Sequence, residues 1–335
     1  AYCCVILAMV LSAILGSANA VAAILCAILI TEMAKDGYDP EFTGSVIAAS
    51  SVLGPIIPPS VTFIIYGVLT GVSVSKMFMA GIVPGILLGV GYATVIAVYT
   101  KKRGYRKSKD HFDAKACGIA FVKAIPALLV PVVIIGGIMG GIFTPTESGA
   151  VAVVAAVVAA IIYRSFDIKS LPDVLLNTGM TTAAIMLIVA FGNIIGWSMS
   201  IDNIPNKITN AILSVTDNQQ IVLLLIILCL FAIGCVMDAF AAMYVFTPVF
   251  YPLATAVGID PIHFGIIFCL MLTIGLITPP VGMLLFVTSN ISGVPLAKLS
   301  KTIWPFVLTA MVVVLLLAFV PDLVMFIPNL FAANG

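Results

Sequence analysis

Two proline pairs interrupt apolar stretches that would otherwise be long enough to cross a membrane. Pro58-Pro59 lies within residues 42–69, and Pro279-Pro280 lies within residues 264–291. Proline removes a backbone donor and blocks the helical path. At membrane depth a freed carbonyl is costly unless it faces protein or a wet cavity. The sequence therefore predicts two broken helices, each made of half-helices that meet near the middle of a membrane.

The composition excludes a soluble domain. Hydrophobic residues make up 62% of the 335 residues and charged residues 9%, whereas soluble domains carry about 25% charged residues. A net charge of +1 gives no reason to expect a nucleic-acid partner. The seven cysteines form no CxxC pair, so neither a disulfide framework nor a zinc site is predicted. The chain opens at Ala1 inside an apolar run without a charged leader, and we expect its beginning to be missing.

Hydropathy also predicts unbroken spans and two re-entrant hairpins. Membrane-spanning helices need about 20 apolar residues. The unbroken candidates are residues 77–99, 121–141, 147–163, 177–199 and 302–320. Two further apolar stretches, residues 2–33 and 221–253, carry small or polar clusters at their centres, residues 16–19 and 234–238. We interpret these two stretches as hairpins that enter and leave on one side, with polar tips.

The distribution of Lys and Arg supports this count. With Lys35 placed in the cytoplasm, the layout puts the linker at residues 101–109 inside and the loop at residues 202–218 outside, with the C-terminal Asn334 also outside. Of the 15 Lys and Arg, only Lys76 and Lys207 then fall outside. Because cytoplasmic loops carry the excess of positive charge, counting either hairpin as a full crossing would remove the agreement.

The chain contains an internal repeat. Four motifs recur in the same order at an offset that is constant to within one position, which indicates a duplication. The pairs are residues 37–42 with 258–264, 54–59 with 275–280, 70–76 with 292–298, and Pro84 with Pro305. The layout puts five crossings between the copies, an odd number, so they must face opposite ways. Inverted repeats with matching broken helices are typical of secondary transporters, and they argue against a channel.

At these residues the chain resembles the large membrane subunit of the tripartite ATP-independent periplasmic (TRAP) transporters. The stretches that carry the resemblance are residues 48–60, 66–73, 140–147 and 278–282. The resemblance runs over essentially the whole chain, with the family's first spans absent. At the first tip, the run that begins at Gly16 lacks the acid that the family usually carries after Gly-Ser-Ala.

The resemblance implies sodium-coupled import of an organic acid, of the sialic acid or C4-dicarboxylate type, across the bacterial inner membrane. It implies two partners, a small membrane subunit and a periplasmic substrate-binding protein. It also implies an all-α, elevator-type transporter, in which the hairpins and broken helices slide against the unbroken spans. The expected organisation is residues 1–100 as the first inverted repeat, 101–114 as a cytoplasmic linker, and 115–335 as the second repeat with the scaffold spans.

Candidate site residues follow from the tips and breaks. An acidic substrate needs positive counter-charge, but no Lys or Arg lies at a tip or break. Helix N-termini and bound cations must then supply it. Sodium is a hard cation, for which oxygen ligands are suitable. The candidate sodium ligands are Ser17, Asn19, Ser50, Ser51, Gly54, Gly234, Asp238, Thr273, Gly275 and Thr278. The candidate substrate contacts are Asn19, Ser60, Asp238 and Thr278.

Four acids are also expected to begin helices. Thr144, Pro145 and Glu147 fit a capping box. Asp39 and Asp260 each precede a proline and fit an N-cap. Asp238, an acid at membrane depth, could be a sodium ligand, a proton carrier or a helix cap at the second tip. A cap, alone or combined with ion binding, is the role that we favour. Packing is the alternative for the Ser, Thr and Gly positions in membrane helices.

Two other functions fit the sequence less well. An inverted-repeat dicarboxylate or citrate carrier that works without a binding protein fits the repeat but not the set of family motifs. An intramembrane Ser-His protease needs a buried histidine. His111 lies in the charged linker and His263 is expected at an outer helix start, so the protease is not predicted.

Overall fold

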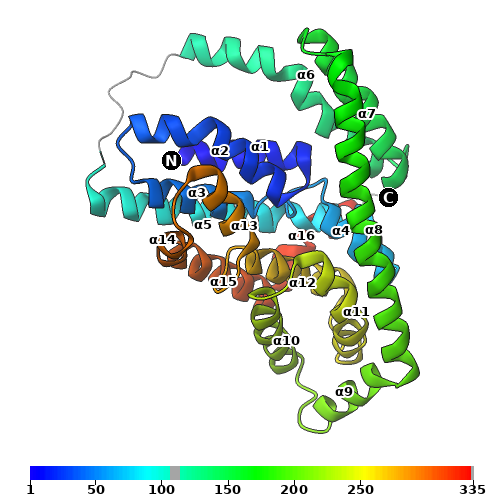
Figure 1. The fold of residues 1–335 in the computed structure, drawn as a ribbon. Helices are drawn as coiled ribbons and strands as arrows, with labels where there is room; N and C mark the ends of the chain where they lie inside the picture. Colours follow the sequence, from blue (N-terminus) through cyan, green and yellow to red (C-terminus); the bar gives the residue numbers. More distant parts are fainter. Residues whose placement is uncertain (106–113, 333–335) are drawn as a thin grey trace. The chain divides into compact units, whose positions relative to one another are not determined.

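The computed structural model describes residues 1–105 and 114–332, and the regular structure in these residues is helical (Figure 1). The first helices are α1 (Tyr2–Leu15), α2 (Ala18–Lys35), α3 (Pro40–Ser51), α4 (Val61–Thr70) and α5 (Val74–Arg103). Next come α6 (Ala114–Met139), α7 (Pro145–Ile162), a 3-10 turn (Ile168–Ser170) and α8 (Leu171–Ile201). The remainder are α9 (Ile204–Leu213), α10 (Gln219–Gly234), α11 (Ala239–Ala256), α12 (Pro261–Gly275), α13 (Met283–Ser292), α14 (Leu296–Thr302), α15 (Trp304–Phe319) and α16 (Pro321–Ala332). Arg106, Lys107, Lys109, His111 and Asn334 lie outside the described residues.

Contacts divide the chain into two units, Lys107–Ala190 and the combination of Ala1–Arg106 with Phe191–Gly335. In the smaller unit α6 packs against α7. The larger unit holds both proline pairs and both predicted tips. The predicted domain boundaries follow the repeat, not these contacts, and they stay a prediction.

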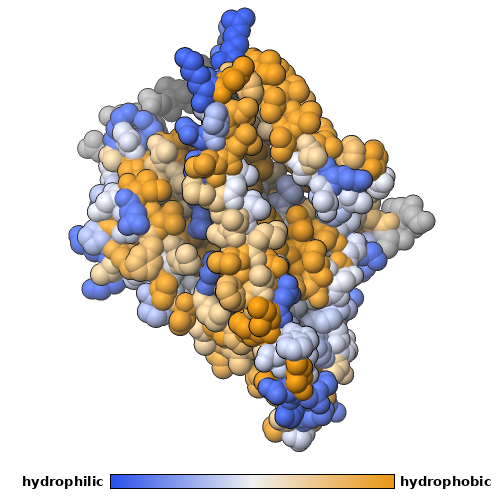
Figure 2. Space-filling view, turned by 45° about the vertical axis from the view of Figure 1, so that its right-hand side comes forward, coloured by the Kyte–Doolittle hydropathy of each residue, from blue (hydrophilic) through white to orange (hydrophobic). Residues whose placement is uncertain are grey.

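Length and apolarity make this chain an integral membrane protein. Six helices among the described residues are long and apolar enough to cross a membrane, or seven if the pair α14 and α15, bent by 47°, counts as one span. Four predicted spans are confirmed as the single helices α5, α6, α7 and α8. Large apolar side chains are exposed along them and over much of the surface in view (Figure 2). Such faces are stable against lipid and not against water.

The repeat extends to the starts of the helices. Ala18 and Ala239 are the first residues of α2 and α11, and they share the offset of the sequence motifs. Pro40 and Pro261, the first residues of α3 and α12, share it as well. For the helices that follow the proline pairs, the offset is one position larger. This larger offset relates the first residue of α4 to that of α13, and the first residue of α5 to that of α14. Both proline pairs contain a cis peptide bond. The duplicated sequence therefore gives the same order of helices in each copy, with a proline pair at the same place in that order.

The two copies exchange equivalent contacts. A glycine of each copy is covered by two side chains of the other copy, and these partners are themselves equivalent in the repeat. The contacts are Gly44 with Thr288 and Leu299, and Gly265 with Tyr66 and Met77. Likewise α13 packs on α2 and α3, while α4 packs on α11 and α12. Reciprocal contacts of this kind are what a twofold relation between two copies produces.

Ion pairs gather several helix ends at one face of the larger unit. Asp39 at the start of α3 pairs with Arg103 at the end of α5, and Glu41 pairs with Lys298 of α14 at 2.8 Å. The Tyr105 hydroxyl donates to Asp39 at 2.6 Å. This bond, together with Arg103, lowers the pKa of the Asp39 carboxyl. Asp39 occupies the predicted N-cap position with Pro40 as the first residue of α3, but its carboxylate is bonded to side chains and makes no capping bond to the first turn.

The other predicted caps are confirmed. The Thr144 and Glu147 capping box is present at the start of α7, and both Asp260 and Asp238 accept backbone N–H groups of the helices they precede. His263 lies in the first turn of α12, so the predicted helix start is confirmed, but its side chain is buried, with Nε2 2.9 Å from the Leu317 carbonyl. The first turn of α12 packs against α15 and excludes solvent there, which hydropathy alone did not indicate.

Candidate functional site between two tips and two breaks

The first tip lies directly on the first break. A Cβ built on Gly54 would be 2.9 Å from the carbonyl carbon and oxygen of Ser17, which is too close for any side chain. Gly16 has a φ of +60°, and a Cβ there would be 2.6 Å from the Pro59 carbonyl oxygen. Only glycine permits this approach of backbone to backbone. The sequence prediction that this tip and this break belong together is consistent with the contact.

The second tip also lies directly on its break, although it does so through Gly234, which is four residues before the counterpart of Ser17. A Cβ built on Gly275 would be 2.5 Å from the Cα of Gly234 and 2.6 Å from its carbonyl carbon and oxygen. Val281, just after Pro280, donates its backbone N–H to the Cys235 carbonyl at 3.3 Å. Gly54 and Gly275 are equivalent in the repeat, so the same glycine of each copy receives its own hairpin tip.

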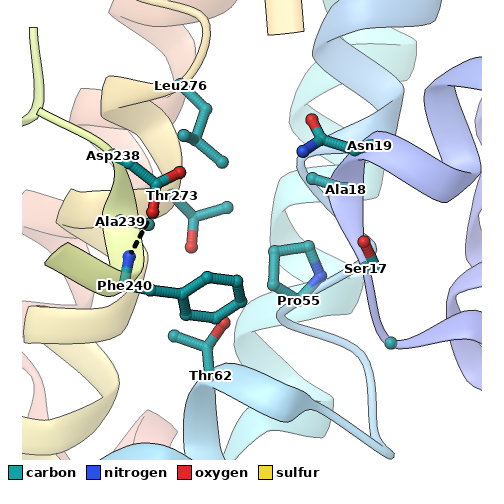
Figure 3. A pocket seen from close by; sticks show the side chains of 11 residues that line it. Ser17, Ala18, Asn19, Pro55, Thr62, Asp238, Ala239, Phe240, Thr273 and Leu276 are labelled. Carbon is teal, nitrogen blue, oxygen red and sulfur yellow. Dashed lines mark hydrogen bonds between the residues drawn. The ribbon is translucent and has the colours of Figure 1, made fainter. Parts of the chain in front are cut away.

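A small cavity lies where the two tips and two breaks converge (Figure 3). Its lining comes from the first turns of α2, α4 and α11, from the last turn of α12 and from the residues just after α3 and α12. The lining residues are Gly16, Ser17, Ala18, Asn19, Pro55, Thr62, Asp238, Ala239, Phe240, Thr273 and Leu276. The cavity measures about 30 Å³, enough for a water molecule or a bare cation but not for an organic acid.

Most of the lining consists of repeat-equivalent pairs. Residues at matching positions of the two copies face the cavity from both sides. These pairs are Ser17 with Asp238, Ala18 with Ala239, Asn19 with Phe240, and Pro55 with Leu276. The cavity is thus lined by corresponding residues of both copies. Two of the pairs, Ser17 with Asp238 and Asn19 with Phe240, change their chemistry between the copies.

The charge distribution around the cavity is one-sided. Asp238 is the only residue with a formal charge among the described residues that line it. Its carboxylate accepts the Phe240 N–H at 2.9 Å and thereby caps α11. Ser17 stands at the same place before α2, but its side chain makes no capping bond. The first-turn N–H groups of α2 are thus the uncapped helix N-terminus at the cavity, and they carry a partial positive charge.

The predicted site residues divide into three groups. Ser17, Asn19, Asp238 and Thr273 line the cavity. Gly54, Gly234 and Gly275 form the tip contacts behind it. The remaining four, Ser50, Ser51, Ser60 and Thr278, are buried beside the breaks and are not part of the cavity lining.

The buried hydroxyls of the third group differ in their partners. Ser51 and Thr278 bond back to Ile47 and Ile274 of their own copies, at 2.7 and 2.9 Å. Ser60 caps α4 by accepting the N–H of Phe63 at 3.2 Å. Ser50, whose side chain is 1% exposed, makes no hydrogen bond to a nitrogen or oxygen atom, and the Cys4 thiol lies within hydrogen-bond reach of its hydroxyl. A thiol is a weak partner, so Ser50 is the least satisfied hydroxyl in the third group.

The carbonyls before the breaks have more hydrogen-bond partners than the proline pairs predict. The last turns of α3 and α12 tighten, so that Gly54 donates to Ser51 and Thr278 donates to Gly275 at 3.0 Å. Such turns satisfy terminal carbonyls. Each carbonyl retains a second lone pair, which still permits a cation to bind. No group of three or more His, Cys, Asp and Glu placed to hold a metal ion occurs in the part of the chain that is described.

Several cavity residues escaped the sequence prediction. Thr62 is the second residue of α4, whose start was not assigned, and Phe240 is the second residue of α11, for which only the cap Asp238 was predicted. Pro55 and Leu276 were interpreted only as part of the breaks. The repeat offset held the necessary signal, because Phe240 is the counterpart of the predicted Asn19.

Comparisons with known proteins agree with this arrangement. The family model of the "Tripartite ATP-independent periplasmic transporter, DctM component" matches residues 1–323. The sialic acid TRAP transporter large permease protein SiaM of Vibrio cholerae is 36% identical over 324 residues, which are 96% of this chain and 75% of that protein. The C4-dicarboxylate TRAP transporter large permease protein DctM of Pseudomonas aeruginosa is 35% identical over 330 residues, 97% of this chain and 76% of that protein.

A putative TRAP transporter large permease protein of Haemophilus influenzae is 38% identical over 319 residues, 95% of this chain and 75% of that protein. The family model and these identities cover nearly all of the chain and agree with its apolar helices. The chain therefore belongs to the DctM component family of the tripartite ATP-independent periplasmic transporters, and it is a multi-pass bacterial membrane transporter and not an enzyme.

Proposed function

We propose that this chain imports an organic acid across the bacterial inner membrane by sodium-coupled, elevator-type transport. One observation carries the proposal. Both tips and both breaks, predicted separately from sequence, converge on one cavity lined by equivalent residues of two copies. In secondary transporters, substrate and coupling ions bind at the interface between repeats, next to broken helices.

The inverted arrangement of the repeats belongs to this proposal. We take the pair α1 and α2 and the pair α10 and α11 as re-entrant hairpins, since each contributes a tip to the cavity. The reciprocal packing of α4 and α13 supports a single body that holds both hairpins and both breaks. A moving domain that carries its substrate through the membrane needs such a body, because its site has to travel intact.

Sodium fits the groups next to the breaks. The hydroxyl of Ser50, which has only a weak thiol partner, and the carbonyls of the tightened turns offer neutral oxygen, and Asp238 and Thr273 add oxygen at the cavity itself. These are ligands that a hard cation prefers. We propose that the acid's carboxylate binds at the uncapped N-terminus of α2, away from Asp238, in a state of the transporter whose cavity is larger than the present 30 Å³ or so.

The partners are part of the proposal as well. The matched family is tripartite, and this chain corresponds to one of its components. A small membrane subunit would pack on the membrane portion, and a periplasmic binding protein would deliver the acid. Relatives named for sialic acid and for C4-dicarboxylates leave the identity of the acid open.

Reconstitution tests the proposal. The chain, the small subunit and the binding protein are assembled in proteoliposomes with an inward sodium gradient, and uptake of labelled acid is followed. We expect uptake that disappears when potassium replaces sodium and falls to background without the binding protein. Robust uptake by this chain alone would assign it instead to carriers that need no binding protein.

A further inference from the structure

An apolar groove lies between α1 and α5, and it shares no lining residue with the cavity at the tips and breaks. Its volume is about 200 Å³, and its lining exposes no polar atom. An apolar cavity of about 150 Å³ stays dry and can hold a benzene molecule. The groove therefore has room for a hydrocarbon segment and offers nothing to a polar ligand. The lining residues are Tyr2, Val5, Ile6, Met9, Ile86, Gly89, Val90 and Ala93.

A small residue makes the groove, and exposed residues leave it open. Gly89 is buried in its lining, and a Cβ there would be 3.0 Å from the Met9 Sδ. On the two helices that form the walls, Ile6 and Val90 are 63% and 60% exposed. Because these helices lie in a membrane, the groove opens to acyl chains and not to water.

The groove and the helix beyond it extend through one leaflet. Its inner end is at the depth of the first break, because a Cβ on Gly85, next to Ile86, would be 2.7 Å from the side chain of Ile57. Lys101 follows Ile86 by 15 positions in the continuous helix α5, a distance of about 22 Å. One leaflet with its headgroup layer is about 20–22 Å deep. Lys101 therefore lies at the level of the headgroups when Ile86 lies near the middle of the membrane.

Positive charge lies at the headgroup end of α5. The side of this helix that lines the groove continues at helical spacing from Ala93 through Ala97 to Lys101. Lys102 follows directly. Within the described part of the chain neither lysine forms an ion pair, whereas Arg103 already has an acidic partner. Lysines in such a place attract the anionic phosphate of a lipid headgroup.

The opposite wall changes character at the same end. α1 has 14 residues, so it extends for about 21 Å from the first tip to Tyr2. Tyrosine is enriched where the membrane meets water, and the side chain of Tyr2 is 46% exposed. Both walls thus pass from apolar side chains to polar groups over the depth of one leaflet, as a phospholipid does.

We propose that this groove binds one acyl chain of an anionic phospholipid, whose phosphate is held by Lys101 and Lys102. With these lysines in the cytoplasm, as the distribution of Lys and Arg predicts, the lipid belongs to the inner leaflet. The proposal needs only a chain that spans the membrane, so it is independent of the transported acid and of the coupling ion.

Native mass spectrometry tests this site on the complete chain, purified with the proposed small subunit in a mild detergent. Phosphatidylglycerol and phosphatidylcholine with identical acyl chains are added at equal concentration, and the lipids retained by each protein are counted. Only the first carries a net negative charge. We expect the parent to retain one phospholipid in preference to others and to select phosphatidylglycerol.

The headgroup contact is tested by removing the lysine charges. The preference for phosphatidylglycerol should fall about fivefold for each lysine lost, in Lys101→Gln and further when Lys102→Gln is added. One lipid should still be retained, because the groove is intact. Lys101→Arg should keep the preference, since it keeps the charge. Lys301→Gln, at an exposed lysine of α14 outside the groove, is the control and should match the parent.

The acyl-chain contact is tested by filling the groove. Ala93→Phe should lower the retention of both lipids to the level of nonspecific binding, and Ala93→Leu serves if the phenylalanine variant does not fold. Val98→Phe is the matched control, because Val98 lies on the same helix, 59% exposed and outside the groove. It should retain lipid as the parent does.

Four results would overturn the proposal. The parent could retain both lipids equally, the double lysine variant could keep the full preference, or both Ala93 variants could keep full retention. A parent that retains no phospholipid would also refute it, because the groove would then be covered by protein or too shallow to hold a chain.

Discussion

Gly275→Ala should separate the second tip from the second break. The added methyl would lie 2.5 Å from the Cα of Gly234 and 2.6 Å from its carbonyl carbon and oxygen, where real Cβ contacts are 3.0 Å or longer. The obstructing atoms are backbone, so relief requires α10 or α12 to shift. Overpacking of this kind costs about 1–3 kcal/mol. Replacing Gly by Ala in a helix interior gains up to about 1 kcal/mol in helix propensity. At Gly275 this gain is smaller, because the residue is the last of α12.

The assay is the thermal unfolding midpoint in detergent, measured with sodium-dependent uptake by the assembled transporter. A loss of about 1–3 kcal/mol corresponds to a fall of roughly 2–6 °C in a protein of this size. Gly196→Ala is the control, because a Cβ there meets only Pro248 at an ordinary 3.7 Å. It should be neutral or slightly stabilising. A Gly275→Ala protein with the midpoint and uptake of the parent would show that the tip does not rest on the break as described.

Three further predictions concern the break, the topology and the charged face. Thr278→Val removes a hydroxyl bonded to Ile274 and should weaken the sodium dependence of transport with near-normal expression; an unchanged sodium activation curve would exclude this side chain from the sodium site. Single cysteines at Ser108, which lies outside the described residues, and at Asn218 should react from opposite sides of the membrane; reaction from the same side would refute the hairpin count. Because the pKa of Asp39 is lowered in the fold, its contribution to stability is complete above the ordinary value of 3.8 and is lost as pH falls below it. Asp39→Asn should therefore flatten the acid side of the stability profile, and an equally steep fall in the variant would assign the pH dependence to other groups.

Much of this architecture could be predicted because a membrane leaves few backbone conformations open to the chain. Proline pairs, tip glycines and the constant offset each act through the backbone, and a backbone break in lipid must be covered by protein. The contacts of Gly54 with Ser17 and of Gly275 with Gly234 follow from that requirement. Four uninterrupted spans could be predicted because an unbroken helix satisfies its own backbone groups in lipid.

The details that depend on tertiary packing could not be predicted. Thr278 looked like a free oxygen, yet its hydroxyl turns back to Ile274. The position of Asp39 before Pro40 predicted a capping bond to the helix. Its carboxylate is bonded instead to Arg103 and Tyr105, which lie far along the chain. Phe240 looked like any apolar residue after a polar tip, and only its position opposite Asn19 shows that it faces the cavity.

The exchange of half-helices between the copies has a consequence for synthesis. The first copy emerges from the ribosome with α2 and α3 complete, but α13, which packs on both, follows only after most of the chain has been made. Until then Gly44 lacks the cover of Thr288 and Leu299, and the face of α3 that carries it is open to lipid or to a chaperone. Neither half can therefore finish folding alone. A chain truncated after α5 should be an insertion intermediate that is recognised and degraded, and the two halves made as separate polypeptides should accumulate only when they are expressed together.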